Sequence, residues 1–312
     1  MLRNHRFPAL KNLRFLVGTA GIHPTIFIIH ISLSCEPALT NSIKIQNLLK
    51  EPNFFTSHMQ AYIAGVGYTG MPGWKGHRAS VVVFFAGCNF KCPACFNSEI
   101  LSFSEDFLTD TKEIKLRIDE FLSKDKGLSK IDSAIMTGGE PTLQRQALLS
   151  IARFCKSRKL AVRLETNGTK PDAIKSVIAE GLVDSVCLDI KSPPEPAAFE
   201  RLTRSQTFFK SSDELIKDIH SSIKLLRENE EDLEIEIRTP IDGEVVSSLQ
   251  QVAKIAESIG NIKCIWKIYP MKLCDSAGRQ YSDESSLKLI SKLRKFSRQI
   301  AGKYPEMRIE IE

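Results

Sequence analysis

The stretch Gly87-Cys-Asn-Phe-Lys-Cys-Pro-Ala-Cys95 contains three cysteines, Cys88, Cys92 and Cys95, and follows directly on the apolar run Val81–Ala86. No fourth cysteine or histidine follows at ligand distance. A 4Fe-4S cluster takes four ligands, usually cysteine thiolates. Three thiolates from one short loop can therefore bind a cluster and leave one iron open to an exogenous molecule. An open iron can take part in chemistry.

Zinc is the main alternative ligand for these cysteines. Closed zinc sites have four ligands, which typically come in paired C-x2-4-C or H-x3-5-H sets. Cys95 has no such partner pair, and His77 could complete a site only by folding back from upstream of the predicted strand. Buried cysteines without any ligand are a further alternative, but this spacing is more typical of a ligand set.

A second motif, Gly138-Gly139-Glu140-Pro141, lies about forty-five residues after the cysteines. It stands inside Ser133–Gln144, which predicts a short buried strand, a glycine turn and a helix opened by proline. Glycines let the backbone approach a ligand closely, and a carboxylate can accept hydrogen bonds from an ammonium group. Alone the motif would indicate an ordinary β-α turn, but it follows the cysteines by one β-α unit.

Strand-like and helix-like patterns alternate from residue 81 onward. The predicted strands are Val81–Ala86, Ser133–Met136, Leu160–Glu165, Ser185–Ile190, Leu233–Arg238 and Lys263–Tyr269. The predicted helices are Ile114–Leu122, Ala147–Lys156, Pro171–Glu180, Glu214–Arg227, Val245–Glu257 and Ser285–Ala301, and Met307–Ile311 is a predicted edge strand. Such alternation implies a parallel sheet with right-handed crossovers. Six units cannot close an eight-stranded barrel, so we expect a partial (β/α)6 barrel, open on one side, with its site at the C-terminal strand ends.

Residues 1–58 differ from the rest of the chain in charge. They hold six Lys/Arg and two Glu, and so account for four of the six positive charges of the whole sequence. The remainder is nearly balanced, so charge does not indicate nucleic-acid binding. Phe15–Leu33 is apolar, but two histidines and a proline interrupt it, and we expect no membrane anchor. We expect a leader in 1–58, either disordered or an overlong start, and one domain in 59–312.

The eight cysteines do not form a disulfide pattern, because three are clustered and the others are scattered. A reducing cytosol is therefore the expected compartment. Cys155 and Cys187 fall in apolar helix and strand patterns, which are typical of buried, inert thiols.

The C-x3-C-x2-C spacing and the Gly-Gly-Glu-Pro turn together resemble the radical S-adenosylmethionine (radical SAM) superfamily. The resemblance implies that Cys88, Cys92 and Cys95 bind a 4Fe-4S cluster and that SAM chelates the open iron. It also implies that Gly138 to Pro141 hydrogen-bond the amino group of SAM. One electron from the reduced cluster would cleave SAM to methionine and a 5′-deoxyadenosyl radical.

Three further strand ends, Leu164–Thr169, Cys187–Lys191 and Glu236–Pro240, resemble those of glycyl-radical-enzyme activating proteins. This resemblance runs from about Met59 to Pro270. It implies that Lys191 and Arg238 engage the SAM carboxylate. It also implies a monovalent cation near SAM, held as in pyruvate formate-lyase activase by Glu165, Thr166, the Cys187 carbonyl and Asp189.

Three observations qualify this resemblance. Glu165 replaces the usual aspartate of the cation site. Asp189 and Lys191 alternate along one strand, so a plain salt bridge is the alternative interpretation of that pair. The position before the third cysteine is usually aromatic and packs on adenine, but here it is Ala94, and Phe96 is the candidate to replace it.

The residues of these motifs most resemble those of archaeal-type activating proteins of the anaerobic ribonucleoside-triphosphate reductase. The implied partners are that glycyl radical enzyme and an electron donor such as flavodoxin or ferredoxin. The alternatives are a radical SAM enzyme acting on a small molecule or nucleobase, such as a 7-carboxy-7-deazaguanine synthase, and a non-catalytic iron–sulfur or zinc protein. An activase requires a wide groove for a loop of another protein, and a small-molecule enzyme requires a closed polar pocket. The loop Ser192–Ser211 is expected to border that groove, with Arg201 and Arg204 contacting the partner.

Overall fold

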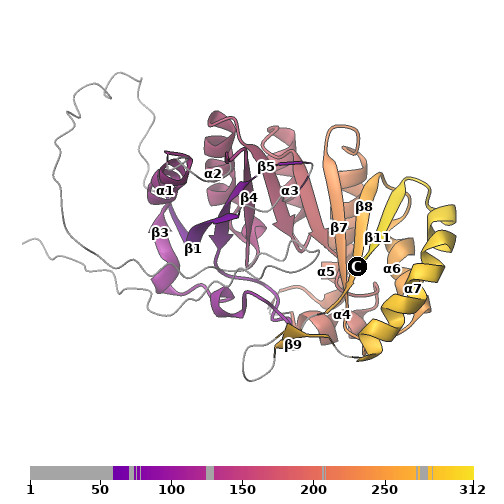
Figure 1. Ribbon diagram of the computed structural model, residues 1–312. Helices are drawn as coiled ribbons and strands as arrows, with labels where there is room; N and C mark the ends of the chain where they lie inside the picture. The colour runs from indigo at the N-terminus through magenta and orange to yellow at the C-terminus, as the bar shows by residue number, and fades with distance from the viewer. Residues whose placement is uncertain are drawn as a thin grey trace, which may run out of the picture.

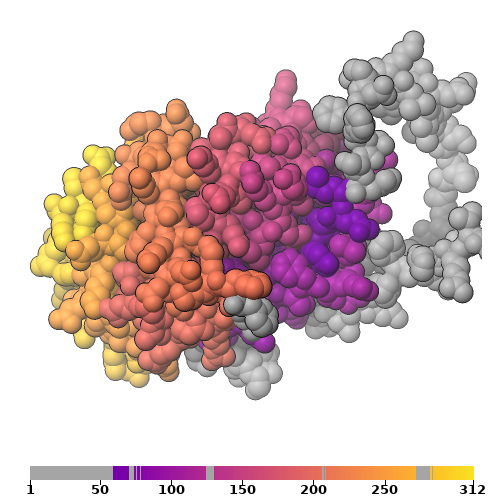
Figure 2. Space-filling model, turned by 180° about the vertical axis from the view of Figure 1, so that it is seen from behind, coloured from indigo at the N-terminus to yellow at the C-terminus, as the bar shows by residue number. Residues whose placement is uncertain are grey.

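The computed structural model describes residues 59–69, 74, 76–77, 79–123, 130–205, 207, 209–271, 273–274, 280–282 and 284–312. The predicted leader, residues 1–58, lies outside the described residues. Figure 1 shows one sheet that extends from β1 (Gln60–Thr69) and β3 (Leu108–Asp110) to β11 (Met307–Ile311). Figure 2 shows from behind that the earliest and the latest described residues lie at opposite ends of the molecule.

Nine strands form this sheet in the order β11-β8-β7-β6-β5-β4-β2-β1-β3. The six predicted strands are its parallel centre: β2 (Ser80–Phe85), β4 (Ser133–Gly138), β5 (Ala161–Thr166), β6 (Ser185–Asp189), β7 (Glu234–Ile241) and β8 (Cys264–Pro270). β11 lies parallel to β8 as the predicted edge strand, whereas β1 is antiparallel to both β2 and β3. Among the described strands the edges β3 and β11 do not pair, so the expected partial barrel, open on one side, is confirmed. β9 (Leu273–Cys274) and β10 (Gln280–Tyr281) pair separately.

Helices follow the strands at the predicted places. Their bounds are α1 (Thr111–Ser123), α2 (Arg145–Ser157), α3 (Pro171–Ala179), α5 (Ser212–Arg227), α6 (Leu249–Ile259) and α7 (Glu284–Lys303). Short 3-10 helices occupy η1 (Ser98–Ile100), η2 (Glu105–Phe107) and η3 (Pro141–Gln144). In the described part of the chain, no helix is long and apolar enough to cross a membrane.

The prediction for α6 was wrong at its start, which lies at Leu249 and not at Val245. The Asp242 carboxylate accepts hydrogen bonds from the backbone N–H groups of Val245 and Val246, which fixes a turn there. Ser248 then forms a capping box with Gln251, and this reciprocal pair sets the first helical turn.

The segment Ser192–Ser211, predicted to be a loop, contains an additional helix, α4 (Pro196–Thr203). Proline is well suited to the first turn of a helix because its missing N–H would be unpaired there. The buried ring of Phe199 packs edge-on against Phe90 of the cysteine loop, with 5.5 Å between the ring centroids. The insertion therefore supports the cysteine loop directly.

The two faces of the parallel strands differ in polarity because side chains alternate along a strand. One face carries fully buried apolar residues that pack in the main core under the helices: Leu164, Leu188, Ile237 and Trp266. The other face carries charged residues in the same strands: Arg163, Glu165, Asp189, Glu236, Arg238 and Lys267. The concave side of the open barrel is therefore built for polar chemistry.

Candidate functional site

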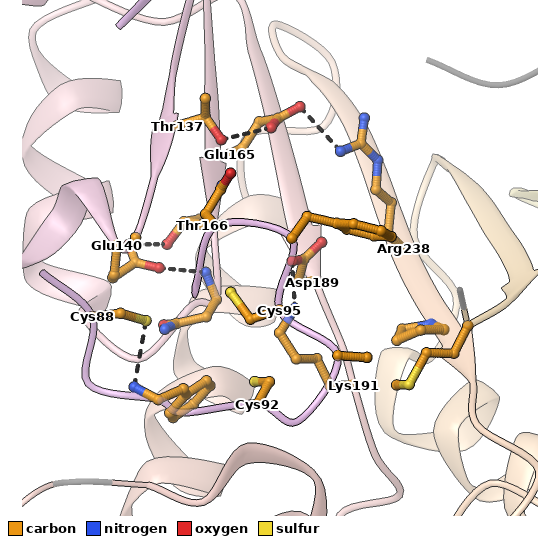
Figure 3. Close-up of a pocket in the computed structure, with 18 of the residues that line it drawn as sticks. Cys88, Cys92, Cys95, Thr137, Glu140, Glu165, Thr166, Asp189, Lys191 and Arg238 are labelled. Carbon is orange, nitrogen blue, oxygen red and sulfur yellow. Dashed lines mark hydrogen bonds and ion pairs between the residues drawn. The ribbon is translucent and has the colours of Figure 1, made fainter. Parts of the chain in front are cut away.

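A cavity of about 310 Å³ opens at the C-terminal ends of the parallel strands. Its lining includes these sequence-predicted site residues: Cys88, Cys92, Cys95, Gly138, Gly139, Glu140, Glu165, Thr166, Asp189, Lys191 and Arg238. Pro141 begins η3 beside it. Figure 3 shows the cysteines at one end of the cavity and Glu165 and Arg238 at the other. The strand ends thus bring together residues that are far apart in the sequence.

Backbone hydrogen bonds hold the cysteine loop at both of its sides. The N–H of Cys88 donates to the Leu101 carbonyl at 3.0 Å, and the N–H of Lys91 donates to the Thr203 carbonyl at 2.8 Å. Within the loop, the N–H of Cys95 donates to the Cys92 carbonyl at 3.1 Å. The three thiols are half-buried in a loop that is anchored to α4 on one side.

The thiols lie in an environment that disfavours their ionisation. Burial is the largest cause that raises the pKa of all three, and it acts with the charge of Glu140 to raise the pKa of Cys88 to about 12. The nearby Lys191 ammonium has the opposite effect on Cys92 and Cys95. Metal ions bind cysteine as the thiolate, so binding of iron here would release the thiol protons.

The donor set fits the cluster that the sequence motif implies. Cys88, Cys92 and Cys95 supply three thiols from one loop, and all three line the cavity. A 4Fe-4S cluster takes four ligands, usually thiolates, so three thiolates would leave one iron free for another ligand.

The glycine turn packs directly on the start of the cysteine loop. Gly138 has a φ of 122°, which side-chain-bearing residues rarely adopt. A Cβ on Gly139 would lie 2.2 Å from the carbonyl oxygen of Gly87. The N–H of Glu140 donates to that same carbonyl at 2.8 Å. Glycine is therefore required at both positions for the two loops to meet.

The carboxylate of Glu140 is buried and hydrogen-bonded within the protein. It is 1% exposed and accepts hydrogen bonds from the N–H and hydroxyl of Thr142, the hydroxyl of Thr166 and the N–H of Asn167. Burial raises its pKa in spite of these four bonds. These hydrogen bonds tie the glycine turn to the end of β5.

Lys191 and Arg238, two of the cationic side chains that line the cavity, are paired with carboxylates of the protein. Lys191 Nζ lies 2.6 Å from Asp189 Oδ2, so the salt bridge considered as an alternative is present and lies in the site. Burial opposes the charge of Lys191, but Asp189, Cys92 and Tyr269 together outweigh it and raise the pKa of the ammonium well above its usual value. Arg238 donates from Nε to Glu236 at 2.6 Å and from Nη1 to Glu165 at 3.0 Å.

The sequence interpretation missed several polar residues around this cavity. Thr137 donates to Glu165 at 2.9 Å, Lys267 Nζ lies 3.0 Å from Glu236, and Arg163 lies beneath both carboxylates. The sequence signal for Arg163 and Glu236 is a period of two, which places residues on one face of a strand. Arg163 precedes Glu165 by two positions, as Glu236 precedes Arg238. β5 and β7 therefore each present two charged residues to the concave face.

Comparisons with known proteins agree with this geometry. The model of the radical SAM superfamily matches residues 82–238. A protein of Methanocaldococcus jannaschii, named as a glycyl-radical enzyme activating enzyme, is 30% identical over 58% of this chain and 69% of its own length. A 7-carboxy-7-deazaguanine synthase of Hyperthermus butylicus is 36% identical, but over only 30% of this chain and 36% of its own.

A solved structure supports the fold. The radical SAM methyltransferase from Sphaerobacter thermophilus aligns with a TM-score of 0.52 and 13% identity, over 74% of this chain and 66% of that one. The family match spans about half of the chain and includes the cysteine loop, the glycine turn, the ends of β5 and β6, and β7 as far as Arg238. The chain therefore belongs to the radical SAM superfamily, whose enzymes use a 4Fe-4S cluster and S-adenosylmethionine.

Proposed function

We propose that this radical SAM enzyme is an activase that generates a glycyl radical on a partner enzyme, the anaerobic ribonucleoside-triphosphate reductase. The observation that carries the proposal is the apolar part of the cavity lining. It includes Phe96, Leu101, Leu202, Pro240, Pro270 and Met271. A glycine-bearing protein loop offers backbone and apolar surface, which such a cavity can receive.

The residues divide into three groups in this proposal. Cys88, Cys92 and Cys95 hold the cluster, and Lys191 and Arg238 bind the SAM carboxylate by charge-assisted hydrogen bonds. The backbone of Gly138 to Glu140 binds the SAM amino group. When bound, the cluster and SAM together supply reductive SAM cleavage and abstraction of a hydrogen atom. The protein positions the reacting groups and excludes water, and needs no general base.

The pairing of charges also favours a protein substrate. Within the described part of the chain, the cavity cations each face a carboxylate: Lys191 faces Asp189, Arg238 faces Glu165 and Glu236, and Lys267 faces Glu236. SAM would already compete with these carboxylates for the cations, and a small anionic substrate would have to compete as well. A backbone loop of a protein carries no such charge and would not need the cations.

A radical SAM enzyme acting on a small molecule or nucleobase is the second candidate. It is favoured by the identity with the 7-carboxy-7-deazaguanine synthase, which is higher than that with the named activating enzyme, although over a shorter segment. The shared segment covers 92 residues, fewer than lie between Cys88 and Arg238. It is therefore too short to support a common substrate.

Glycyl radical formation is the direct test. Anaerobically reconstituted protein, reduced in the presence of SAM, should produce the EPR signal of a glycyl radical on the reductase. The double variant Arg201→Ala/Arg204→Ala should lower this radical yield about tenfold and leave the slow SAM cleavage without partner unchanged, because both arginines are exposed on or next to α4, beside the cysteine loop.

The matched control is Arg153→Ala/Arg158→Ala, which removes two exposed arginines from the α2 region, where each pairs with a surface carboxylate. It should leave the radical yield unchanged. The small-molecule candidate would replace the activase if a free nucleobase stimulated 5′-deoxyadenosine formation and no glycyl radical enzyme did.

A further inference from the structure

Arg163, on β5, is a charged residue buried directly beneath the cavity. Its side chain is 1% exposed. Its Nη2 lies 2.8 Å from Glu236 Oε1, its Nε lies 3.5 Å from Glu165 Oε1, and its Nη1 donates to the Ser185 hydroxyl at 3.3 Å. Burying a charge is costly unless partners compensate it, so a guanidinium in this place requires an explanation.

The contacts of Arg163 with the carboxylates are electrostatic more than they are directional hydrogen bonds. Nη2 is close to Glu236, yet among the described residues it has no partner in hydrogen-bond geometry. The carboxylate therefore lies off the N–H directions, where the electrostatic attraction remains and the directional bond is weak. Burial opposes the charge, but the neighbouring Cys187, Glu236 and Glu165 raise the pKa of Arg163, so the guanidinium remains a permanent cation.

The two carboxylates beside Arg163 are the same ones that hold Arg238. Arg238 contacts Glu236 Oε1 at 2.6 Å and Glu165 Oε1 at 3.0 Å. Both guanidinium groups thus share one oxygen of each carboxylate, and Lys267 neutralises the other oxygen of Glu236. Without Arg163, the buried carboxylate of Glu236 and the half-buried one of Glu165 would have, among the described residues, Arg238 and Lys267 as their cationic neighbours.

The same contacts bear on the monovalent cation that the sequence resemblance implied. Glu165 faces Arg163 and Arg238, and Asp189 faces the Lys191 ammonium at 2.6 Å. Both carboxylates of the expected cation site therefore already have cationic side chains as neighbours. An added metal ion would meet like charges at close range.

We propose that Arg163 is a positioning residue, an internal cation that neutralises Glu165 and Glu236 and so holds Arg238 toward the cavity without a bound monovalent metal ion. The inference rests on the proposed role of Arg238 in binding SAM. It predicts that this enzyme, unlike one with a cation site, neither needs nor responds to sodium or potassium.

Thermal unfolding and SAM binding of the full chain test the proposal under anaerobic conditions. Both are measured in choline chloride and in potassium chloride of equal ionic strength. For the wild type, the melting temperature should agree within about 1 °C and the dissociation constant of SAM within about twofold. Tighter SAM binding in potassium, by tenfold or more, would overturn the proposal.

The variant Arg163→Met removes the internal cation and keeps an apolar side chain of similar length. In choline it should melt several degrees below the wild type and bind SAM at least tenfold more weakly. Potassium or sodium should restore part of both losses, because a small cation can then occupy the space between Glu165 and Glu236. A folded Arg163→Met protein that gains nothing from these ions would contradict the proposal, since a merely structural role predicts that result.

Two further variants complete the design. Arg163→Met/Glu236→Gln removes one charge of each sign, so it should melt above the single variant and show no response to potassium. The potassium response of the double variant can be measured even if the single variant does not fold. Arg158→Met loses an exposed arginine that forms a bidentate pair with Asp119, and it should show no cation response. A potassium response in the double variant would count against the proposal. The melting data do not depend on SAM, so they test Arg163 even if the enzyme fails to bind SAM or to activate a partner.

Discussion

Glu236 is the residue on which most charges of the concave face converge. Its two oxygens contact Arg163, Arg238 and Lys267, and the Cys187 thiol donates to it at 3.6 Å. Burial by itself raises the pKa of this carboxyl, but the cations outweigh it and hold the pKa well below the ordinary value of 4.5. Its ionised form is therefore part of the folded state.

The variant Glu236→Gln should show the consequence for acid stability. A carboxyl with a lowered pKa contributes stability that is present above its unfolded value and is lost as the pH falls. We expect the variant to be about 3 kcal/mol less stable at neutral pH. Between about pH 5 and pH 3 it should lose less stability than the wild type, as measured by urea unfolding at each pH.

Glu228→Gln is the control, because Glu228 is exposed and pairs only loosely with Lys224, at 3.9 Å. It should change the unfolding free energy by less than about 0.5 kcal/mol. Parallel acid profiles of wild type and Glu236→Gln would show that the internal charge network does not stabilise the fold.

The cysteines give the second prediction at this scale. Anaerobically reconstituted wild type should bind about four irons per chain, and Cys88→Ala should lose nearly all of them, because two thiolates cannot hold the cluster. Cys155→Ala, which removes a buried thiol of α2, should keep the iron. Stoichiometric zinc without iron in anaerobically purified protein would contradict the assignment of these ligands.

At the scale of elements, helix α4 contacts the cysteine loop and helps to hold it in place. Phe199 packs on Phe90, and the Thr203 carbonyl accepts the backbone N–H of Lys91 and lies 3.9 Å from the Cys92 thiol. These contacts join the loop after β6 to the loop after β2. The cluster site is therefore coupled to an insertion that lies more than a hundred residues further along the chain.

Phe199→Ala should loosen this coupling. Removing a buried phenylalanine typically costs about 3 to 5 kcal/mol, part of which should appear as faster loss of the cluster. The rate at which visible absorbance of the reconstituted protein bleaches in air measures that loss. Phe209→Ala is the matched control in the same insertion, because its ring is 96% exposed, and it should bleach at the wild-type rate.

At the scale of the whole molecule, the site is assembled from strand ends across the sheet, from β2 at the cysteine loop to β7 at Arg238. A ligand in this cavity joins the two sides of an open barrel whose edges do not pair within the described chain. Binding of SAM should therefore stabilise the entire domain and not one loop.

SAM at one hundred times its dissociation constant should add about 2.7 kcal/mol of stability. For a domain of this size, that corresponds to a rise in melting temperature of about 5 to 10 °C. Lys191→Ala, which removes a proposed SAM contact, should reduce the rise at the same SAM concentration, whereas Arg158→Ala should retain it. An equal shift in both variants would remove Lys191 from the SAM site.

The sequence by itself determined the order of strands and helices and the three-cysteine loop. The buried strands and amphipathic helices have strong local periods, and the cysteine spacing and the glycine turn are local as well. Lys191 and Arg238 were expected at the site because a family resemblance pointed to their strand ends, and both line the cavity. The helix α4 was missed because prolines and charged residues in Ser192–Ser211 resemble a loop, while its stability depends on packing against Phe90.

Only the tertiary structure decided which charges meet. Arg238 reaches Glu165 across seventy-three residues of sequence, and it does so because β5, β6 and β7 pair in parallel with Glu165 beside Cys187 and Asp189 beside Arg238. The burial of Arg163 and the internal use of Glu140 depend on the same register. Hydrogen bonds and ion pairs act over a few ångströms, so their partners follow from strand register and loop packing, which no local pattern contains.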